Sequence, residues 1–120
     1  MAKIWIMKPD QKGILNNYFS SNNIDSIFPN GSKSKLILHP EKDDMYSIYY
    51  DKNINNISLP NNPNATWLAK VLNLPSEGIF VVNRLVFDSK GVVPADMDMT
   101  VKEFLNFVKL IQQQKNQMYL

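Results

Sequence analysis

Short apolar runs dominate the first half of the chain and predict β-strands. They cover residues 3–7, 34–39, 45–50 and, more weakly, 54–59. The runs are rich in β-branched and aromatic residues, and turn-forming residues lie between them. The second and third runs are joined by the turn-rich sequence PEKDD, which predicts a hairpin. Residues 13–19 are interpreted instead as one or two helical turns.

The second half of the chain predicts a helix, a strand and a longer helix. Asn62 is the candidate N-cap of the first helix, with Pro63 at its first position, and residues 65–74 have apolar side chains at helical spacing. Residues 79–87 form the strongest predicted strand, and its continuous apolar start indicates a central place in the sheet. The last helix is expected over residues 100–114.

The last helix has a wide apolar face. Thr100 and Glu103 have the spacing of a capping box at its start. The apolar face consists of Val101, Phe104, Leu105, Phe107, Val108, Leu110 and Ile111. It belongs either to a core helix or to a helix shared between the core and a subunit interface. The residues expected at such an interface are Phe104, Phe107, Val108 and Ile111. The chain would then form a homo-oligomer, a dimer or a larger assembly.

The order of these elements predicts a single α+β domain over residues 1–120. An antiparallel sheet of four to six strands is expected, with the middle helix and the longer C-terminal amphipathic helix packed on it. Residues 1–60 are mostly strands, and residues 61–120 form a helix–strand–helix unit.

Composition and charge exclude several classes of function. The chain has no cysteine, which removes disulfides, thiolate metal sites and thiol nucleophiles. The net charge is only +2 and lysine is spread along the chain, so binding to long nucleic acid is not expected. No segment approaches the roughly 20 apolar residues of a membrane span. We therefore expect a protein that does not bind a membrane.

The sequence offers little catalytic chemistry. His39 is the only histidine and precedes a proline at the end of a strand, and no nucleophile elbow or phosphate-binding glycine loop is present. The acidic clusters are Glu41, Asp43 and Asp44 in a turn, and Asp96 and Asp98 before the last helix. Neither cluster completes the oxygen-rich ligand set of a divalent cation. We expect no catalytic residue, no metal and no cofactor.

Recognition chemistry is better represented. Arg84 is the only arginine among 13 basic residues, and its planar guanidinium suits a phosphate better than lysine does. Aromatic rings can stack on a base, and asparagine offers both donors and acceptors. The residues expected to bind a small nucleotide are Arg84, Asn83, Thr66, Asn64, Asn62 and Phe80. The alternative is that the aromatic residues pack in the core, the asparagines reflect only the overall composition of the chain, and Arg84 is an exposed strand residue.

Four short stretches of the chain, residues 64–66, 82–84, 91–93 and 100–105, form a pattern of motifs. In these stretches the chain resembles the viral ring-nuclease (anti-CRISPR) family, whose members cleave cyclic tetra-adenylate. Pro63 stands where that family has its catalytic histidine, so the resemblance implies binding without cleavage. By analogy, it points to phage Thoeris anti-defence proteins, which sequester a cyclic nucleotide signal.

The function expected from the sequence is therefore non-catalytic sequestration of a small cyclic nucleotide, of the cyclic ADP-ribose or cyclic oligoadenylate type, in the cytosol of the host bacterium. The first alternative is a small viral-type protein that binds and inhibits a host protein. The second is a ring nuclease with unrecognised active-site residues.

Overall fold

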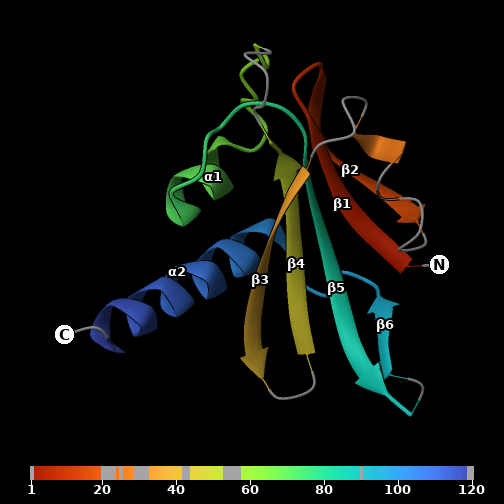
Figure 1. Ribbon diagram of the computed structural model, residues 1–120, viewed down its shortest axis with the longest axis vertical. Helices are drawn as coiled ribbons and strands as arrows, with labels where there is room; N and C mark the ends of the chain where they lie inside the picture. Colours follow the sequence, from red (N-terminus) through yellow and green to blue (C-terminus); the bar gives the residue numbers. More distant parts are fainter. Residues whose placement is uncertain are drawn as a thin grey trace.

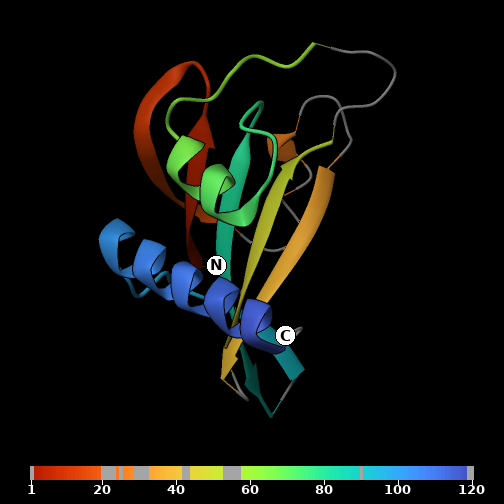
Figure 2. The same cartoon turned by 90° about the vertical axis from the view of Figure 1, so that its left-hand side faces the viewer.

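The protein combines one antiparallel sheet with two helices that lie against one of its faces (Figures 1 and 2). The computed structural model describes residues 2–19, 24, 26–28, 33–41, 44–52, 58–89 and 91–118. Within these residues the sheet has six strands. The predicted α+β class, the antiparallel sheet and the C-terminal helix are confirmed.

The strands are β1 (Ala2–Lys8), β2 (Gln11–Phe19), β3 (Lys33–Glu41), β4 (Asp44–Asp51), β5 (Phe80–Asp88) and β6 (Gly91–Ala95). The helices are α1 (Thr66–Leu72) and α2 (Val101–Met118). The order across the sheet is β2-β1-β5-β4-β3, and β6 pairs with β5 outside this path.

Strand β5 is the centre of the sheet because three strands pair with it. On one side β4 follows it from Phe80 to Val86. On the other side β1 pairs with its first part, where Trp5 lies opposite Val82, and β6 pairs with its second part. Figure 1 shows β1 and β6 on the same side of β5. The continuous apolar start of this strand is explained by these neighbours.

The main core lies between the sheet and the two helices. Phe104 of α2 is fully buried, with its ring centroid 5.4 Å from that of Trp5 on β1 and 5.3 Å from that of Tyr46 on β4. Helix α1 adds three buried residues, Leu68, Ala69 and Leu72. Edge-to-face packing of these rings fixes α2 against β1 and β4.

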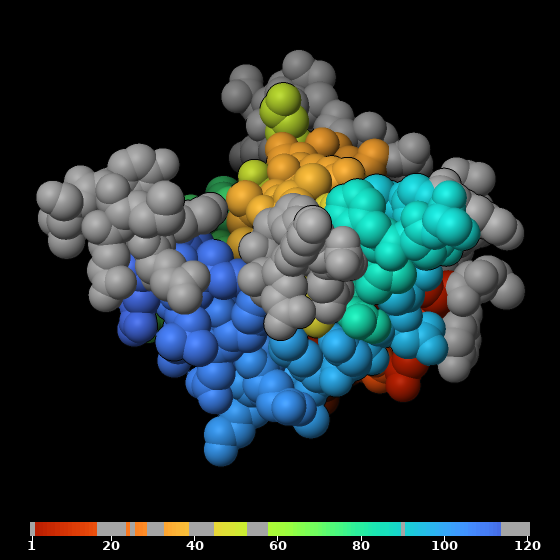
Figure 3. Space-filling model, turned by 90° about the horizontal axis from the view of Figure 1, so that it is seen from below, coloured from red at the N-terminus to blue at the C-terminus, as the bar shows by residue number. Residues whose placement is uncertain are grey.

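A second, smaller core lies on the other face of the sheet. It contains Ile4, Ile6 and Val81 from the strands, together with Ile24 and Phe28 from the segment between β2 and β3. Residues of opposite parity along β1 and β5 face the two cores, as the pleat requires. Figure 3 views the molecule from the lower end of the sheet, where β3, the β5–β6 hairpin and α2 meet at the surface.

Several predicted elements are confirmed. The hairpin predicted around PEKDD is the pair β3–β4. The capping box at α2 is formed: the Thr100 N–H donates to Glu103 Oε1 at 3.0 Å, and the Glu103 N–H donates to Thr100 Oγ1 at 3.1 Å. The hydrogen bond from the Thr100 backbone N–H, and after it a hydrogen bond from the Thr100 side chain to the same carboxyl, lower the pKa of Glu103 below its ordinary value.

Other predictions are wrong. Residues 13–19 are not helical but belong to β2, because their backbone pairs with β1, with Ile6 opposite Leu15. Helix α1 begins at Thr66 with Ala65 at the N-cap position, so Asn62 does not cap it. The weak strand predicted over residues 54–59 lies mostly outside the described residues, and Ser58 and Leu59 are not in a strand.

Neither of the two helices combines the length and the apolar character needed to cross a membrane; this statement covers the described residues only.

Candidate functional site

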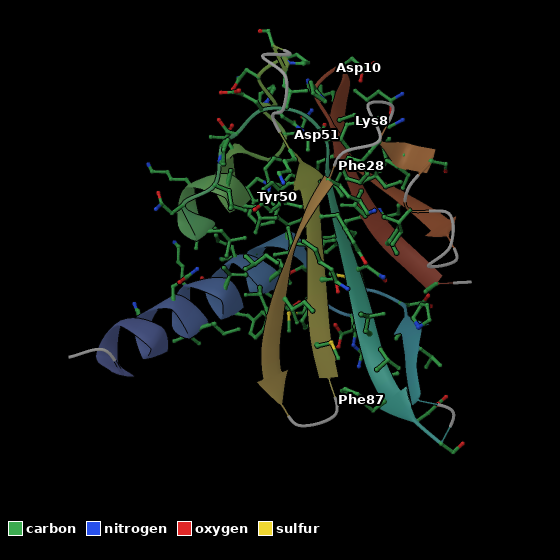
Figure 4. The ribbon with its side chains drawn as sticks, viewed as in Figure 1. Lys8, Asp10, Phe28, Tyr50, Asp51 and Phe87 are labelled. Atoms are coloured by element: carbon green, nitrogen blue, oxygen red, sulfur yellow. The ribbon has the colours of Figure 1, made fainter. Side chains whose placement is uncertain are left out.

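A cavity of about 390 Å³ opens at the end of the sheet where β1 and β4 finish and β5 begins. Its lining residues are Pro9, Asp10, Asp51, Leu59, Pro60, Asn61, Gly78 and Ile79. They come from the β1–β2 turn, the last position of β4, and the segments before α1 and β5. Figure 4 labels Asp10 and Asp51 at this upper end of the sheet. The volume falls in the lower part of the range for small-molecule pockets.

Asp51 is the most unusual side chain on the cavity wall. It is the last residue of β4 and only 8% exposed. Its backbone N–H donates to the Ile79 carbonyl at 3.2 Å, and the Ile79 N–H donates back to Asp51 Oδ2 at 2.6 Å. The other carboxyl oxygen, Oδ1, is buried and has no hydrogen-bond partner among the residues that the structure describes. One half of the carboxyl group is therefore held by the backbone, while the other half is unsatisfied.

Gly78 makes room for this carboxyl group. Its φ is +80°, and a Cβ at this position would lie 2.5 Å from Asp51 Oδ2. The Gly78 N–H donates to the Pro60 carbonyl at 2.8 Å, which joins two walls of the cavity. A residue with a side chain would be strained here and would also displace Asp51.

The electrostatic environment of Asp51 follows from its burial. Loss of water around the carboxyl raises its pKa above the ordinary value, and the hydrogen bond from the Ile79 N–H opposes that rise. Asp10 is a second carboxyl group on the same wall, and it is exposed. None of the described residues that line the cavity is a lysine or an arginine. The cavity thus offers acceptors and negative charge to a ligand.

Two asparagines hold the cavity walls in place. The buried Asn62 donates from Nδ2 to the carbonyls of Met7 at 3.0 Å and Gly78 at 2.7 Å, which ties the end of β1 to the segment before β5. Asn64 donates from Nδ2 to the carbonyls of Lys8 and Gln11, at 2.8 and 2.7 Å, across the β1–β2 turn. The walls are thus preorganised by side-chain hydrogen bonds.

Four of the six residues predicted to bind a nucleotide lie in this region or in the nearby core, but none lines the cavity. Asn62 and Asn64 serve as the ties just described. The Thr66 hydroxyl donates to the Asn62 carbonyl at 3.0 Å. Phe80 is fully buried and stacks with Tyr50 at 6.0 Å in the helix-side core.

The other two residues lie further along β5. Arg84 is partly exposed; its Nε lies 3.5 Å from Asp98 Oδ2, and its Nη1 donates to the Asp96 carbonyl at 3.4 Å. The Tyr46 hydroxyl donates to the same Asp98 carboxylate at 2.7 Å. The guanidinium thus contacts the segment between β6 and α2. Asn83 is buried on the opposite face of the sheet, so the structure does not bring it together with Arg84.

The residues predicted for an oligomer interface lie largely within the chain's own core. Phe104 and Val108 are fully buried, and Phe107 and Ile111 pack against the same cluster. The width of the apolar face is explained by contacts with two strands and α1, so it does not by itself require a second subunit. Leu110, which is 59% exposed, points away from this core.

Sequence reasoning missed Asp51, Gly78 and Ile79. A sequence signal was nevertheless present: Asp51 is the acidic residue that ends an apolar alternation, and Gly78 directly precedes the strongest strand. A glycine beside a central strand often marks a close approach of another group. What the sequence could not show is that these two positions meet.

The fold and the site define an antiparallel α+β protein with a small acidic cavity at one end of its sheet. Within the described ranges, no three His, Cys, Asp or Glu residues gather in a way that could hold a metal ion. Comparison with models of protein families, with curated proteins and with solved structures finds no match for this chain.

Proposed function

We propose that this protein binds a small molecule in the cavity at the end of its sheet and sequesters it without chemical change. The observation that carries the proposal is the preformed cavity itself, which has mostly apolar walls and few polar groups. Such a combination is typical of small-molecule sites. The hydrogen bonds of Asn62 and Asn64 fix the walls before a ligand arrives, which lowers the entropic cost of binding.

The lining chemistry favours binding over catalysis. Among the described lining residues, the polar side chains are two carboxyl groups and one carboxamide, and none is an imidazole, hydroxyl or amine. Asp51 Oδ2 is already bound by the Ile79 N–H, which restricts the carboxyl group as a mobile acid or base. These features support a binding protein.

The ligand class expected from the sequence is a small cyclic nucleotide, and we retain it within this proposal. In that case the biological role is anti-defence, in the cytosol of an infected bacterium. A nucleotide would meet carboxyl groups at the cavity, so its phosphates would remain outside. Only a base would enter.

Native mass spectrometry tests the proposed function. The purified protein is incubated with cyclic ADP-ribose, cyclic tetra-adenylate, cyclic dinucleotides and linear mononucleotides, and the complexes are weighed before and after heat release. We expect one ligand to be retained and returned with unchanged mass. Return of an altered product would show an enzyme instead.

A pair of variants shows whether the cavity is the binding site. Asn61→Trp places a large ring on the cavity wall, at an exposed residue whose replacement should be tolerated. Asn106→Trp makes the same change at an exposed position on α2. We expect the first variant to lose the ligand and the second to keep it. Equal retention by both folded variants would place the site elsewhere.

A further inference from the structure

Strand β3 forms one lateral edge of the sheet. It is the last strand in the order β2-β1-β5-β4-β3, and its nine residues, Lys33–Glu41, pair with β4 on one side. Among the residues that the structure describes, no strand pairs with its outer edge, and Figure 2 shows it as the outermost strand beyond β4. Such an edge presents a row of backbone N–H and C=O groups on which another chain can extend the sheet.

The side chains of β3 differ between the two faces of the sheet. Leu36 and Leu38 pack in the helix-side core. Ile37 points to the opposite face, as the pleat requires, and is 44% exposed. Lys33 and Lys35 alternate with the leucines in the same way and share the face of Ile37. The edge strand therefore has an exposed apolar residue at its centre and positive charge toward its start.

We infer that β3 pairs with β3 of a second copy of this chain, antiparallel, around a two-fold axis that passes beside Ile37. The inference goes beyond the proposed function and does not depend on it, because no residue of β3 lines the cavity. A two-fold axis perpendicular to the sheet keeps the helices of both copies on the same face. The two six-stranded sheets then continue into one.

Full overlap of the nine-residue strand fixes the register of this pairing. Ile37 then meets Ile37 of the second copy, and Leu36 meets Leu38 of the second copy. The two residues of each pair lie on the same face, where cross-strand neighbours stabilise a sheet. At both ends of the paired strands, position 33, a lysine, meets position 41, a glutamate. The edge is thus complementary to itself, with apolar pairs at the centre and opposite charges at the ends.

Other pairings of the sheet edges fit less well. Parallel pairing of two β3 strands would set Lys33 and Lys35 beside their own copies, and like charges directly opposite are destabilising. In β2, the other edge strand, Gly13 has a φ of +84°, which interrupts the extended backbone, and Lys12 is the only charged residue. Pro40 removes one N–H near each end of the β3 pair, which edge strands tolerate, and leaves the central residues able to bond.

Sedimentation equilibrium, from low micromolar to submillimolar concentration, tests the interface. One strand pair is a small interface, so we expect a reversible dimer of the parent protein. Ile37→Lys sets two ammonium groups beside the axis and should weaken the dimer by about tenfold or more. Val92→Lys is the matched control, because Val92 is 49% exposed on β6, away from β3. Leu110→Asp changes the exposed apolar residue of α2. Both of these variants should dimerise like the parent protein.

A charge exchange tests the register. Lys33→Glu and Glu41→Lys each place like charges at both ends of the paired strands, and each should weaken the dimer by about tenfold. The double variant restores opposite charges and should return to within about threefold of the parent protein. Within one chain these positions lie at opposite ends of β3, roughly 26 Å apart at about 3.3 Å per residue. Mutual rescue can therefore arise only between two copies. Circular dichroism verifies that every variant is folded.

The outcomes decide the inference. Loss of the dimer in Ile37→Lys, together with rescue in the double variant, supports it. A parent protein that stays monomeric at submillimolar concentration overturns it and leaves the edge to a different partner. A dimer that Leu110→Asp dissociates and Ile37→Lys does not would place the interface on α2 and also overturn it. So would a double variant that dimerises no better than the single ones.

Discussion

The carboxyl group of Asp51 occupies the space that a side chain at Gly78 would need. The nearest approach of a Cβ placed there is 2.5 Å, to Asp51 Oδ2. Two residues that are far apart in the sequence thus share one small volume, with a hydrogen bond from the Ile79 N–H beside them. This contact shapes the cavity wall and holds the Asp51 carboxyl group against the backbone.

Replacing Gly78 by alanine should destabilise the protein and disturb the cavity. The positive φ alone costs about 1–2 kcal/mol in the free energy of unfolding, and the contact with Asp51 adds to it. Gly13→Ala is the control, because Gly13 has a φ of +84° and nothing within 4 Å of a Cβ. Chemical denaturation of both variants should show a larger loss for Gly78→Ala. Equal losses would mean that Asp51 moves aside freely.

Asn62→Ala should be strongly destabilising because it leaves two buried carbonyls, those of Met7 and Gly78, without their donor. We expect a loss of about 2–4 kcal/mol in the free energy of unfolding, since each buried unsatisfied group costs about 1–3 kcal/mol. The neighbouring Asn61→Ala changes an exposed residue and should cost less than about 0.5 kcal/mol. Similar denaturation midpoints for the two variants would contradict the role assigned to Asn62.

Asp51 should lower stability at neutral pH. Its pKa is raised in the folded state, so the folded protein holds this proton more tightly than the unfolded chain does. The free energy of unfolding therefore increases as the pH falls from the raised pKa of Asp51 to the ordinary value of 3.8, because the folded protein takes up the proton first. We expect Asp51→Asn to be at least as stable as the parent protein at pH 7, with the difference narrowing across that window.

Glu103 provides a control of opposite sign for this pH experiment. The pKa of its carboxyl is lowered by hydrogen bonds from Thr100, so its contribution is present above the unfolded-state pKa and is lost as the pH falls through the folded-state value. Glu103→Gln should therefore be less stable than the parent at neutral pH, and this gap should close in acid. Asp10, Lys52 and Glu77 are present in the parent protein and in both variants, so their effects cancel in the comparison. If Asp51→Asn is less stable than the parent protein at pH 7, the Asp51 carboxyl group does not have the raised pKa that its burial predicts.

Arg84→Lys separates the site expected from the sequence from the cavity. Arg84 is not on the lining, and four strand positions place it roughly 13 Å along β5 from Phe80. We expect the affinity for the tightest ligand of the panel to change less than twofold, measured by calorimetry. Stability should fall by less than about 1 kcal/mol, as is usual for a partly exposed ion pair. A large loss of affinity with an intact fold would restore Arg84 as an anion contact.

The elements that could be predicted are those whose signals are local. The hairpin β3–β4, the central strand β5 and the capping box of α2 each depend on residues close in sequence. Strand β2 was missed because its few apolar residues fit a helical turn equally well, and pairing with β1 decides its conformation. The start of α1 was misplaced because Asn62 uses its side chain on Met7 and Gly78 instead of capping the helix.

The site was less predictable than the fold for the same reason. Arg84 stood out by composition, yet its guanidinium contacts Asp98. Asp51 looked like the ordinary end of a strand. Its burial, its bond with Ile79 and its contact with Gly78 depend on segments that meet only when the sheet is complete. No local pattern carries that information.

The pairing of β5 with both β1 and β6 along one edge has a consequence for the order of folding. Strands β3 and β4 form a hairpin between neighbours in sequence, as do β5 and β6, whereas β1 must wait for β5 to be synthesised. Contacts between distant segments form slowly because a long loop must close first. We expect the β1–β2 hairpin to dock late. It would pair with the first part of β5, which β6 is too short to reach. The cavity walls, which need the end of β1, would then be completed in the final step.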